Sequence, residues 1–267
     1  MAKTAWEIVE IARNPKRKTA LDYIDKVFDS FIELHGDRCF KDDKAIVCGL
    51  ARIGKQNFTV IAEQKGRTTK ENIERNFGMP NPESYRKAIR FMKQAEKFKR
   101  PVITFVDTKG AYPGIGAEER GQGEAIAKSM FEMAGLKVPI IAIVIGEGSS
   151  GGALAIAVGN KVLMLENAVY SILSPEGYSS ILWKDSSRAK EAAGKMKLTA
   201  KDLYEFKIID KIIKEAETEE ENLEKVSKFL RKEIKSILKE FEGMSEDEIV
   251  EQRYQKFRNM GEFKKLK

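Results

Sequence analysis

Two short apolar runs rich in Ile and Val stand in the middle of the chain. Residues 101–106 and 141–145 predict buried strands, because β-branched residues in a short apolar run favour that element. Glycine-rich segments follow at 107–121 and 146–152, and residues 125–133 predict a helix. The chain thus contains two consecutive strand–loop–helix units, whose loops are expected to share a cleft at the carboxyl ends of the strands.

Apolar residues at helical spacing predict amphipathic helices near both ends of the chain. The N-terminal set is Leu21, Ile24, Val27, Phe28, Phe31 and Leu34, which predicts a helix ending near Leu34. Residues 84–98 predict a helix with a basic outer face. The C-terminal set is Leu223, Val226, Phe229, Leu230, Ile234, Ile237, Leu238 and Phe241. Ser245-x-x-Glu248 predicts a capping box that opens a last helix.

Further strands are predicted on both sides of the central units. Residues 46–50 and 58–62 flank the turn 54–57, which is typical of a hairpin. Residues 162–165 and 169–172 predict two more short strands. Together with the helices, these strands define an α/β protein.

Composition and charge exclude several classes of protein. The chain has 267 residues, 42% of them hydrophobic, with no apolar stretch near the length of a membrane span and no secretory signal. Its two cysteines, Cys39 and Cys48, form neither a metal motif nor a disulfide framework, so we expect a cytoplasmic protein. The net charge of +7 arises from lysines that alternate with glutamates, which indicates a solvated surface more than a nucleic-acid site.

The turn after residue 145 admits three chemical interpretations. Gly146-x-Gly148-x-x-Gly151 matches the dinucleotide-binding fingerprint, and Glu166 follows about twenty residues later, as that fingerprint requires. A dinucleotide-binding oxidoreductase is therefore one hypothesis. Glu147 argues against it, because this residue places a carboxylate in a turn that would have to hold a pyrophosphate.

The same turn also resembles a nucleophile elbow and an oxyanion hole. Gly148-x-Ser150-x-Gly152 fits the elbow, but His35 is the only histidine and lies far upstream of Ser150, so a hydrolase of the usual residue order is excluded. In the third interpretation, backbone N–H groups at Gly151 and Gly152 stabilise a developing negative charge, with no side-chain nucleophile. A plain strand-to-helix turn, in which glycine only relieves crowding, fits the spacing equally well.

Five separated motifs carry a resemblance to one protein family. They are Asn76-Phe77-Gly78-Met79-Pro80-Asn81-Pro82-Glu83, Gly110-Ala111-Tyr112-Pro113-Gly114, Ala117-Glu118-Glu119-Arg120-Gly121-Gln122, Gly146-Glu147-Gly148 with Ser150-Gly151-Gly152-Ala153, and Ser174-Pro175-Glu176-Gly177. In order and spacing, the chain from about residue 5 to about residue 215 resembles the carboxyltransferase alpha subunit of bacterial multisubunit acetyl-CoA carboxylase.

The resemblance implies a crotonase-like (ClpP/crotonase) fold, a superhelix of β-β-α units with N- and C-terminal helical additions. We expect an N-terminal helical segment at 1–38, a carboxyltransferase core at 39–216 and a C-terminal helical segment at 217–267. The C-terminal helices can cover the core or grip a partner, and an apolar stripe favours the first.

The resemblance also implies the chemistry. The family transfers a carboxyl group from carboxybiotin, carried on a biotin carboxyl carrier protein, to acetyl-CoA, and the product is malonyl-CoA. Backbone donors at Gly151 and Gly152 would stabilise the biotin oxyanion. Substrate-binding residues are expected at Gly110, Ala111, Tyr112, Gly114, Lys65, Arg67 and Ala153. Lys65 and Arg67 can bind a carboxylate or phosphate, although a solvated charged loop explains them equally well, and Tyr112 can cap the site or simply pack.

Partners and cofactor follow from the same resemblance. The family pairs this subunit with a beta subunit that carries a zinc ribbon, usually as an α2β2 tetramer, and the biotin cofactor belongs to a separate carrier. No metal is expected in this chain. A related biotin-dependent acyl-CoA decarboxylase subunit is the alternative within this fold. The chain departs from the usual family residues at Glu63, Lys109, Ser149, Tyr178 and Ser179.

Overall fold

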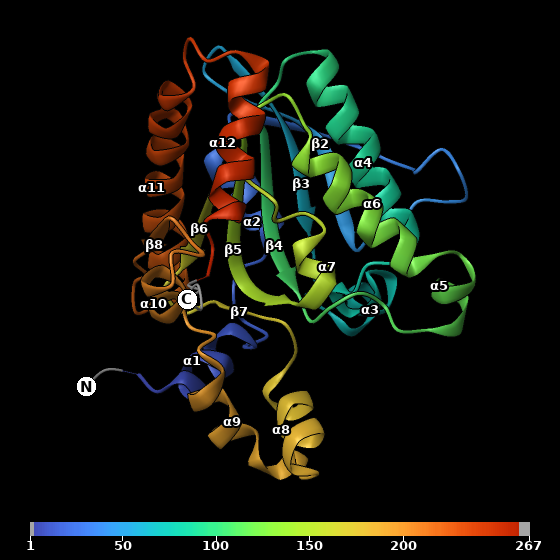
Figure 1. The fold of residues 1–267 in the computed structure, drawn as a ribbon, viewed down its shortest axis with the longest axis vertical. Helices are drawn as coiled ribbons and strands as arrows, with labels where there is room; N and C mark the ends of the chain where they lie inside the picture. The colour runs from blue at the N-terminus through green and yellow to red at the C-terminus, as the bar shows by residue number, and fades with distance from the viewer. Residues whose placement is uncertain (1–2, 262–267) are drawn as a thin grey trace, which may run out of the picture.

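The computed structural model describes residues 3–261 and contains, within that range, a mixed eight-stranded sheet (Figure 1). Its strands are β1 Ser30–Leu34, β2 Ile46–Ile53, β3 Gln56–Glu63, β4 Val102–Thr108, β5 Ile140–Ser149, β6 Lys161–Leu165, β7 Val169–Ser171 and β8 Lys211–Ile213. Their order is β1-β2-β3-β4-β5-β6-β8, and β7 pairs with β5. The long strand β5 pairs with β6 along residues 141–144 and with β7 along residues 147–149.

Strand direction changes within the sheet. β1, β2 and β3 form an antiparallel meander, whereas β3 to β6 and β8 run parallel to one another. All ten residues of β5 and all seven of β4 are buried, as parallel strands covered on both faces should be. The carboxyl ends of β3, β4 and β5 therefore lie side by side at one edge of the sheet.

Helices cover both faces of the sheet. They are α1 Ala5–Ala12, α2 Ala20–Val27, α3 Thr69–Glu74, α4 Pro82–Lys97, α5 Ile115–Glu119, α6 Gln122–Ala134, α7 Ser150–Leu154, α8 Pro175–Trp183, α9 Ala189–Met196, α10 Ala200–Glu205, α11 Glu219–Glu240 and α12 Glu246–Arg258. In Figure 1, α4, α6 and α12 lie in front of the strands, while α2 lies behind them with α11 packed against it.

The N-terminal helix is shorter than the sequence predicts. α2 ends at Val27, Phe28 already has extended backbone angles, and residues 30–34 form the edge strand β1. The prediction of a helix to Leu34 is therefore wrong. Tertiary contacts decide the outcome, because Asp29 accepts hydrogen bonds from Gly54 N–H and from the Arg231 guanidinium, and so starts the strand that pairs with β2.

The other predicted elements are confirmed. β2 and β3 form the expected hairpin, α4 and α11 cover the predicted helical segments, and Ser245 and Glu248 form the capping box of α12. Ile172 lies just beyond β7. The division of the chain at residues 38 and 217 stays a prediction, but residues of α2, α11 and α12 belong to the same hydrophobic cluster as the sheet.

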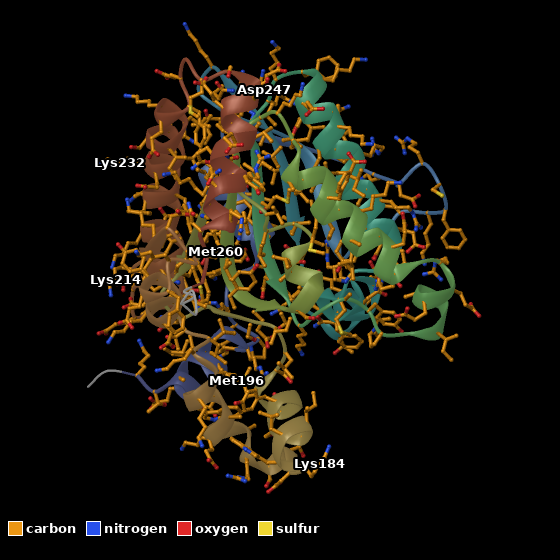
Figure 2. The ribbon with its side chains drawn as sticks, viewed as in Figure 1. Lys184, Met196, Lys214, Lys232, Asp247 and Met260 are labelled. Atoms are coloured by element: carbon orange, nitrogen blue, oxygen red, sulfur yellow. The ribbon has the colours of Figure 1, made fainter. Side chains whose placement is uncertain are left out.

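Three helices project from this body as an arm. α1, α8 and α9 extend below the sheet in Figure 1, and Lys184 marks the far tip of this arm in Figure 2. A small separate cluster holds α1 against α9 and β7, and it contains Val9, Ala12, Val169, Ala193 and Leu198. We call α1, α8 and α9 the arm below. Among residues 3–261, no helix is both long enough and apolar enough to cross a membrane.

Candidate functional site

The two glycine loops touch at the carboxyl ends of β4 and β5. A Cβ atom at Gly152 would lie 2.5 Å from the backbone nitrogen of Ala111 and 2.7 Å from the carbonyl carbon of Gly110. Gly110 has a φ of +132°, a backbone conformation that residues other than glycine rarely adopt. The two loops are therefore in contact, and glycine is required on both sides of it. That they share a substrate cleft stays a prediction.

A sharp turn links β5 to the short helix α7. Ser150 has a φ of +57°, which turns the chain directly from strand into helix. Ser149 occupies the N-cap position and makes no side-chain cap hydrogen bond. The first N–H groups of a helix have no intrahelical acceptor, and those of α7 include the N–H groups of Gly151 and Gly152.

An apolar cavity opens beside this turn. Its volume is about 610 Å³, and Ser150, Gly151 and Leu154 form one wall. The remaining lining residues come from the arm, from β6 and β7, from α10 and the segment after it, and from the end of α12 and just beyond it. They include Tyr170, Ser171, Tyr178, Met196, Lys197, Phe206 and Met260. Met196 and Met260 approach it from the arm and from the body, respectively (Figure 2). Such a cavity suits a compact ring with few charges.

A cluster of charged groups lies under the same strand ends. Lys65 Nζ is 2.6 Å from Asp107 Oδ1 and 3.5 Å from Glu147 Oε1. Arg13 Nε is 2.9 Å from Glu147 Oε2, and its terminal nitrogens bind both carboxylate oxygens of Glu176 at 2.7 and 3.2 Å. The side chains of Asp107 and Glu147 are 6% and 4% exposed, so both carboxylates depend on these cations for compensation. We call Arg13, Lys65, Asp107, Glu147 and Glu176 the charge cluster.

The environment shifts the ionisation of several groups here. Burial works against the charge of Lys65, but the carboxylates of Asp107 and Glu147 outweigh it and raise the pKa of the ammonium. Hydrogen bonds to Glu176 and Glu147 likewise raise the pKa of Arg13 despite its partial burial. Complete burial raises the pKa of Glu63 well above its usual value, although the Asp107 N–H donates to its Oε2 at 2.9 Å. Burial thus favours the neutral form of the Glu63 carboxyl group over the ionised form.

The predicted substrate-binding residues are distributed around the turn. Gly151 lines the cavity, Gly152 lies under the Gly110–Ala111 peptide, and Ala153 is fully buried. The Tyr112 N–H donates to Pro80 O, and the Tyr112 carbonyl accepts from Gln122, so the loop from Gly110 to Gly114 is held from both sides. Their roles toward substrate remain predictions.

The two predicted basic residues occupy different environments. Lys65 is engaged in the charge cluster and its side chain is 18% exposed, whereas Arg67 is 57% exposed and pairs with Asp22. Lys109 is exposed next to Gly110. Contact of Lys65 or Arg67 with substrate stays a prediction. In the part of the chain that the structure describes, no group of three or more His, Cys, Asp or Glu side chains is arranged to hold a metal ion.

The groups required by the two competing interpretations are engaged elsewhere. A side chain at Gly146 would collide with Asp107, so this glycine is required for packing against the chain's own carboxylate, and the Glu147 carboxylate lies in the charge cluster. Glu166 accepts a hydrogen bond from Lys214 instead of a ribose. His35 lies just after β1 and hydrogen-bonds Asp42.

Sequence reasoning missed the structural role of the acids at the strand ends. Glu63, Asp107 and Glu147 each stand at or near the end of an apolar strand, and each is buried. An acid placed directly after a buried apolar run is a usable signal, because burial of a charge requires a partner. Arg13 could not be paired with Glu147 from the sequence, since 134 positions separate them.

Comparison with solved structures identifies the fold. Transcarboxylase 12S has a TM-score of 0.68 over 98% of this chain at 17% identity, and this chain spans only 46% of that one. A Pseudomonas malonate decarboxylase hetero-tetramer gives a TM-score of 0.71 over 88% of this chain and 92% of its own, at 15% identity. The expected crotonase-like fold is confirmed, and its structural neighbours are carboxyltransferases and decarboxylases that act on acyl-CoA or malonate.

Sequence similarity then gives the family. A family model described as acetyl co-enzyme A carboxylase carboxyltransferase-like matches residues 2–261. The acetyl-coenzyme A carboxylase carboxyl transferase subunit alpha of Clostridium perfringens (strain ATCC 13124) is 62% identical over 257 residues, 96% of this chain and 95% of that protein. The same subunit of Geobacillus sp. (strain WCH70) is 56% identical over 265 residues, 97% of this chain and 80% of that protein.

The chain belongs to the family of acetyl-CoA carboxylase carboxyltransferase alpha subunits, whose role is carboxyl transfer. The family expected from the motifs is confirmed. The oxidoreductase and hydrolase interpretations of the glycine turn are wrong, because short glycine patterns recur in unrelated turns. High identity to carboxylase subunits also separates this chain from the malonate decarboxylase, which shares its fold at 15% identity.

Proposed function

We propose that this chain provides the carboxybiotin half of a carboxyltransferase site that makes malonyl-CoA from acetyl-CoA. The observation that carries the proposal is the turn at Ser150 and Gly151, which presents helix N-terminal amides beside an apolar cavity of about 610 Å³. Carboxybiotin bound beside Gly151 would supply both the carboxyl group and the base for the acetyl methyl proton. The C–N bond to the carboxyl carbon breaks, and a C–C bond to the methyl carbon forms.

This chain stabilises the charge that develops on the ureido oxygen. The N–H group of Gly151 is the leading donor, because Gly151 lines the cavity while Gly152 is covered by the Gly110–Ala111 peptide. We assign to Gly152 and Ala153 the shaping of the turn and its dipole, and to the loop from Gly110 to Gly114 the opposite side of the site. Preorganised donors of this kind contribute about 3 kcal/mol each to the stability of a transition state.

The second half of the site is assigned to a partner subunit. This chain spans 46% of the transcarboxylase 12S chain, so a companion of similar size is needed to complete an equivalent site. The names of the relatives as alpha subunits favour a beta subunit as that companion, in an α2β2 assembly, with a biotin carboxyl carrier protein delivering the cofactor. Acetyl-CoA would bind mainly to the beta subunit. The free thiols of Cys39 and Cys48 agree with a cytoplasmic location.

Reconstitution tests the proposal. The purified chain is mixed with a carboxyltransferase beta subunit, and carboxyl transfer from malonyl-CoA to free biotin is followed in the reverse direction. Activity is expected only when both subunits and biotin are present. Absence of activity with a beta subunit that works beside its own alpha subunit would refute the proposal. Methylmalonyl-CoA in place of malonyl-CoA tests which acyl group the site accepts.

A further inference from the structure

The charge cluster joins the arm to the ends of three adjacent parallel strands. Lys65 follows β3, Asp107 lies on β4 and Glu147 lies on β5, while Arg13 caps the end of α1 and Glu176 belongs to α8. Lys65 and Arg13 thus bind different carboxylate oxygens of Glu147. Its ion pairs reach β5, the strand that precedes the glycine turn, through Glu147. They reach the arm through Arg13 and Glu176.

Glu147 sits directly before the segment that forms the proposed anion site. Three residues separate it from Gly151, and its N–H donates to Asp107 Oδ1 at 2.9 Å. Its carboxylate thus fixes the side chain of Glu147, and its N–H fixes the main chain of β5, just where the strand enters the turn. A shift of Glu147 must move Gly148 to Gly151, because strand and turn are continuous.

Arg13 is the group that holds this carboxylate from outside the sheet. Its Nε lies 2.9 Å from Glu147 Oε2, at near-ideal length for a charged hydrogen bond, whereas Lys65 reaches Glu147 only at 3.5 Å and lies closer to Asp107. Without Arg13, two buried carboxylates would share one ammonium. Arg13 itself is anchored by the bidentate pair with Glu176.

We propose that Arg13 is a positioning residue for the carboxyl-transfer reaction: through Glu147 it sets the orientation of the amides at Gly151 and Gly152. Arg13 touches no substrate in this scheme. The effect of Arg13 on the reaction rate rests on the proposed function. Its effect on the rigidity of the turn does not depend on that function.

The kinetic test uses the reconstituted complex with the beta subunit. Arg13→Gln should lower kcat about 100-fold, because misplacement of a catalytic group by about 1 Å has an effect of that size. KM for malonyl-CoA should change by less than about twofold, since that substrate is assigned to the other subunit. Arg188→Gln is the matched control: this arginine also lies in the arm, but its side chain is 43% exposed and pairs with Glu191, so the variant should lower kcat by less than about threefold.

A double variant separates positioning from general weakening. If Arg13 acts through Glu147, the variant carrying both Arg13→Gln and Glu147→Gln should be no slower than either single variant. A double variant whose loss of kcat equals the product of the two single losses would contradict the inference. Arg13→Lys should restore part of the rate, because its single ammonium can reach one of the two carboxylates but not both.

Hydrogen exchange supplies a readout that does not depend on activity. In Arg13→Gln, amides of residues 146–154 should exchange at least about tenfold faster than in the unmodified chain, while those of β2 and β3 stay unchanged. An unchanged rate at residues 146–154 would overturn the inference even if the complex proved inactive. If the unmodified complex is inactive but Arg13→Gln still speeds exchange at residues 146–154, the proposed function is refuted and the positioning role of Arg13 stands.

Discussion

Gly152 packs directly against the backbone nitrogen of Ala111. The distance from an added Cβ to that nitrogen is 2.5 Å, and the carbonyl carbon of Gly110 is 2.7 Å away. Both neighbours are main-chain atoms, which cannot move aside as a flexible side chain can. The contact couples the β4 loop to the β5 turn, so the geometry of each loop depends on the other.

Gly152→Ala should therefore lower the activity of the reconstituted complex by at least about tenfold and destabilise the chain by about 1–3 kcal/mol, because overpacking forces the two loops apart. Carboxyl transfer and urea unfolding are the measurements.

Gly123→Ala is the matched control. Gly123 lies exposed in α6 with nothing within 4 Å of an added Cβ, so this variant should keep full activity and gain about 0.5–1 kcal/mol from lower chain entropy. Equal behaviour of the two variants would contradict the close contact.

Glu63 offers a prediction about pH. Its pKa is raised by burial well above the usual 4.5, so below about pH 4 both the folded and the unfolded chain hold the proton. Above the ordinary pKa only the folded chain retains it, and stability falls as pH rises toward the folded-state pKa. Glu63→Gln keeps an acceptor for the Asp107 N–H and has no proton to lose.

The free energy of unfolding of Glu63→Gln, relative to the unmodified chain, should therefore increase as the pH rises above about 5, by at most about 1.4 kcal/mol per pH unit. Urea titrations at several pH values measure it. Glu119→Gln, at an exposed position of α5, controls for loss of a carboxyl group. A difference that stays constant with pH would mean that Glu63 is ionised in the folded chain.

Local features of this fold are accessible from the sequence because they depend on neighbouring residues. The apolar run of β5, the hairpin of β2 and β3, and the capping box at Ser245 follow from spacing and side-chain type alone. The helix predicted to Leu34 shows the limit of such patterns. Phe31 and Leu34 fit a helical stripe, but pairing of β1 with β2 gives these residues a different set of neighbours.

The candidate site divides in the same way. The glycine turn is visible in the sequence, since strand, turn and helix are consecutive. The charge cluster is not, because an ion pair between residues as distant as Arg13 and Glu147 depends on how the arm meets the end of β5. Lys65 illustrates the consequence: a lysine near a cleft suggests an anion ligand, whereas here its closest anions are Asp107 and Glu147 of the chain itself.

Arg253 fixes the last helix to the body. It is 1% exposed, and its guanidinium donates to the carbonyls of Met133, Ala134, Leu136 and Val138 and to Asn160 Oδ1. Arg253→Met should destabilise the chain by at least about 2 kcal/mol, because buried carbonyls lose their donors. Arg258→Met, at an exposed position near the end of α12, should change stability by less than about 0.5 kcal/mol. Urea unfolding that fails to separate the two would contradict this role for Arg253.

The apolar cavity beside Gly151 predicts how the site can be blocked. Ser171 lines it from β7 and is half-buried, so Ser171→Trp places an indole in the cavity without disturbing the core. If the cavity receives biotin, the KM for free biotin in the reconstituted reaction should rise at least about tenfold, while the thermal midpoint changes by less than about 3 °C. Ser236→Trp, at an exposed position of α11, is the control and should leave both quantities unchanged. A biotin KM that is the same in both variants would place the ligand elsewhere and refute the assignment of this cavity.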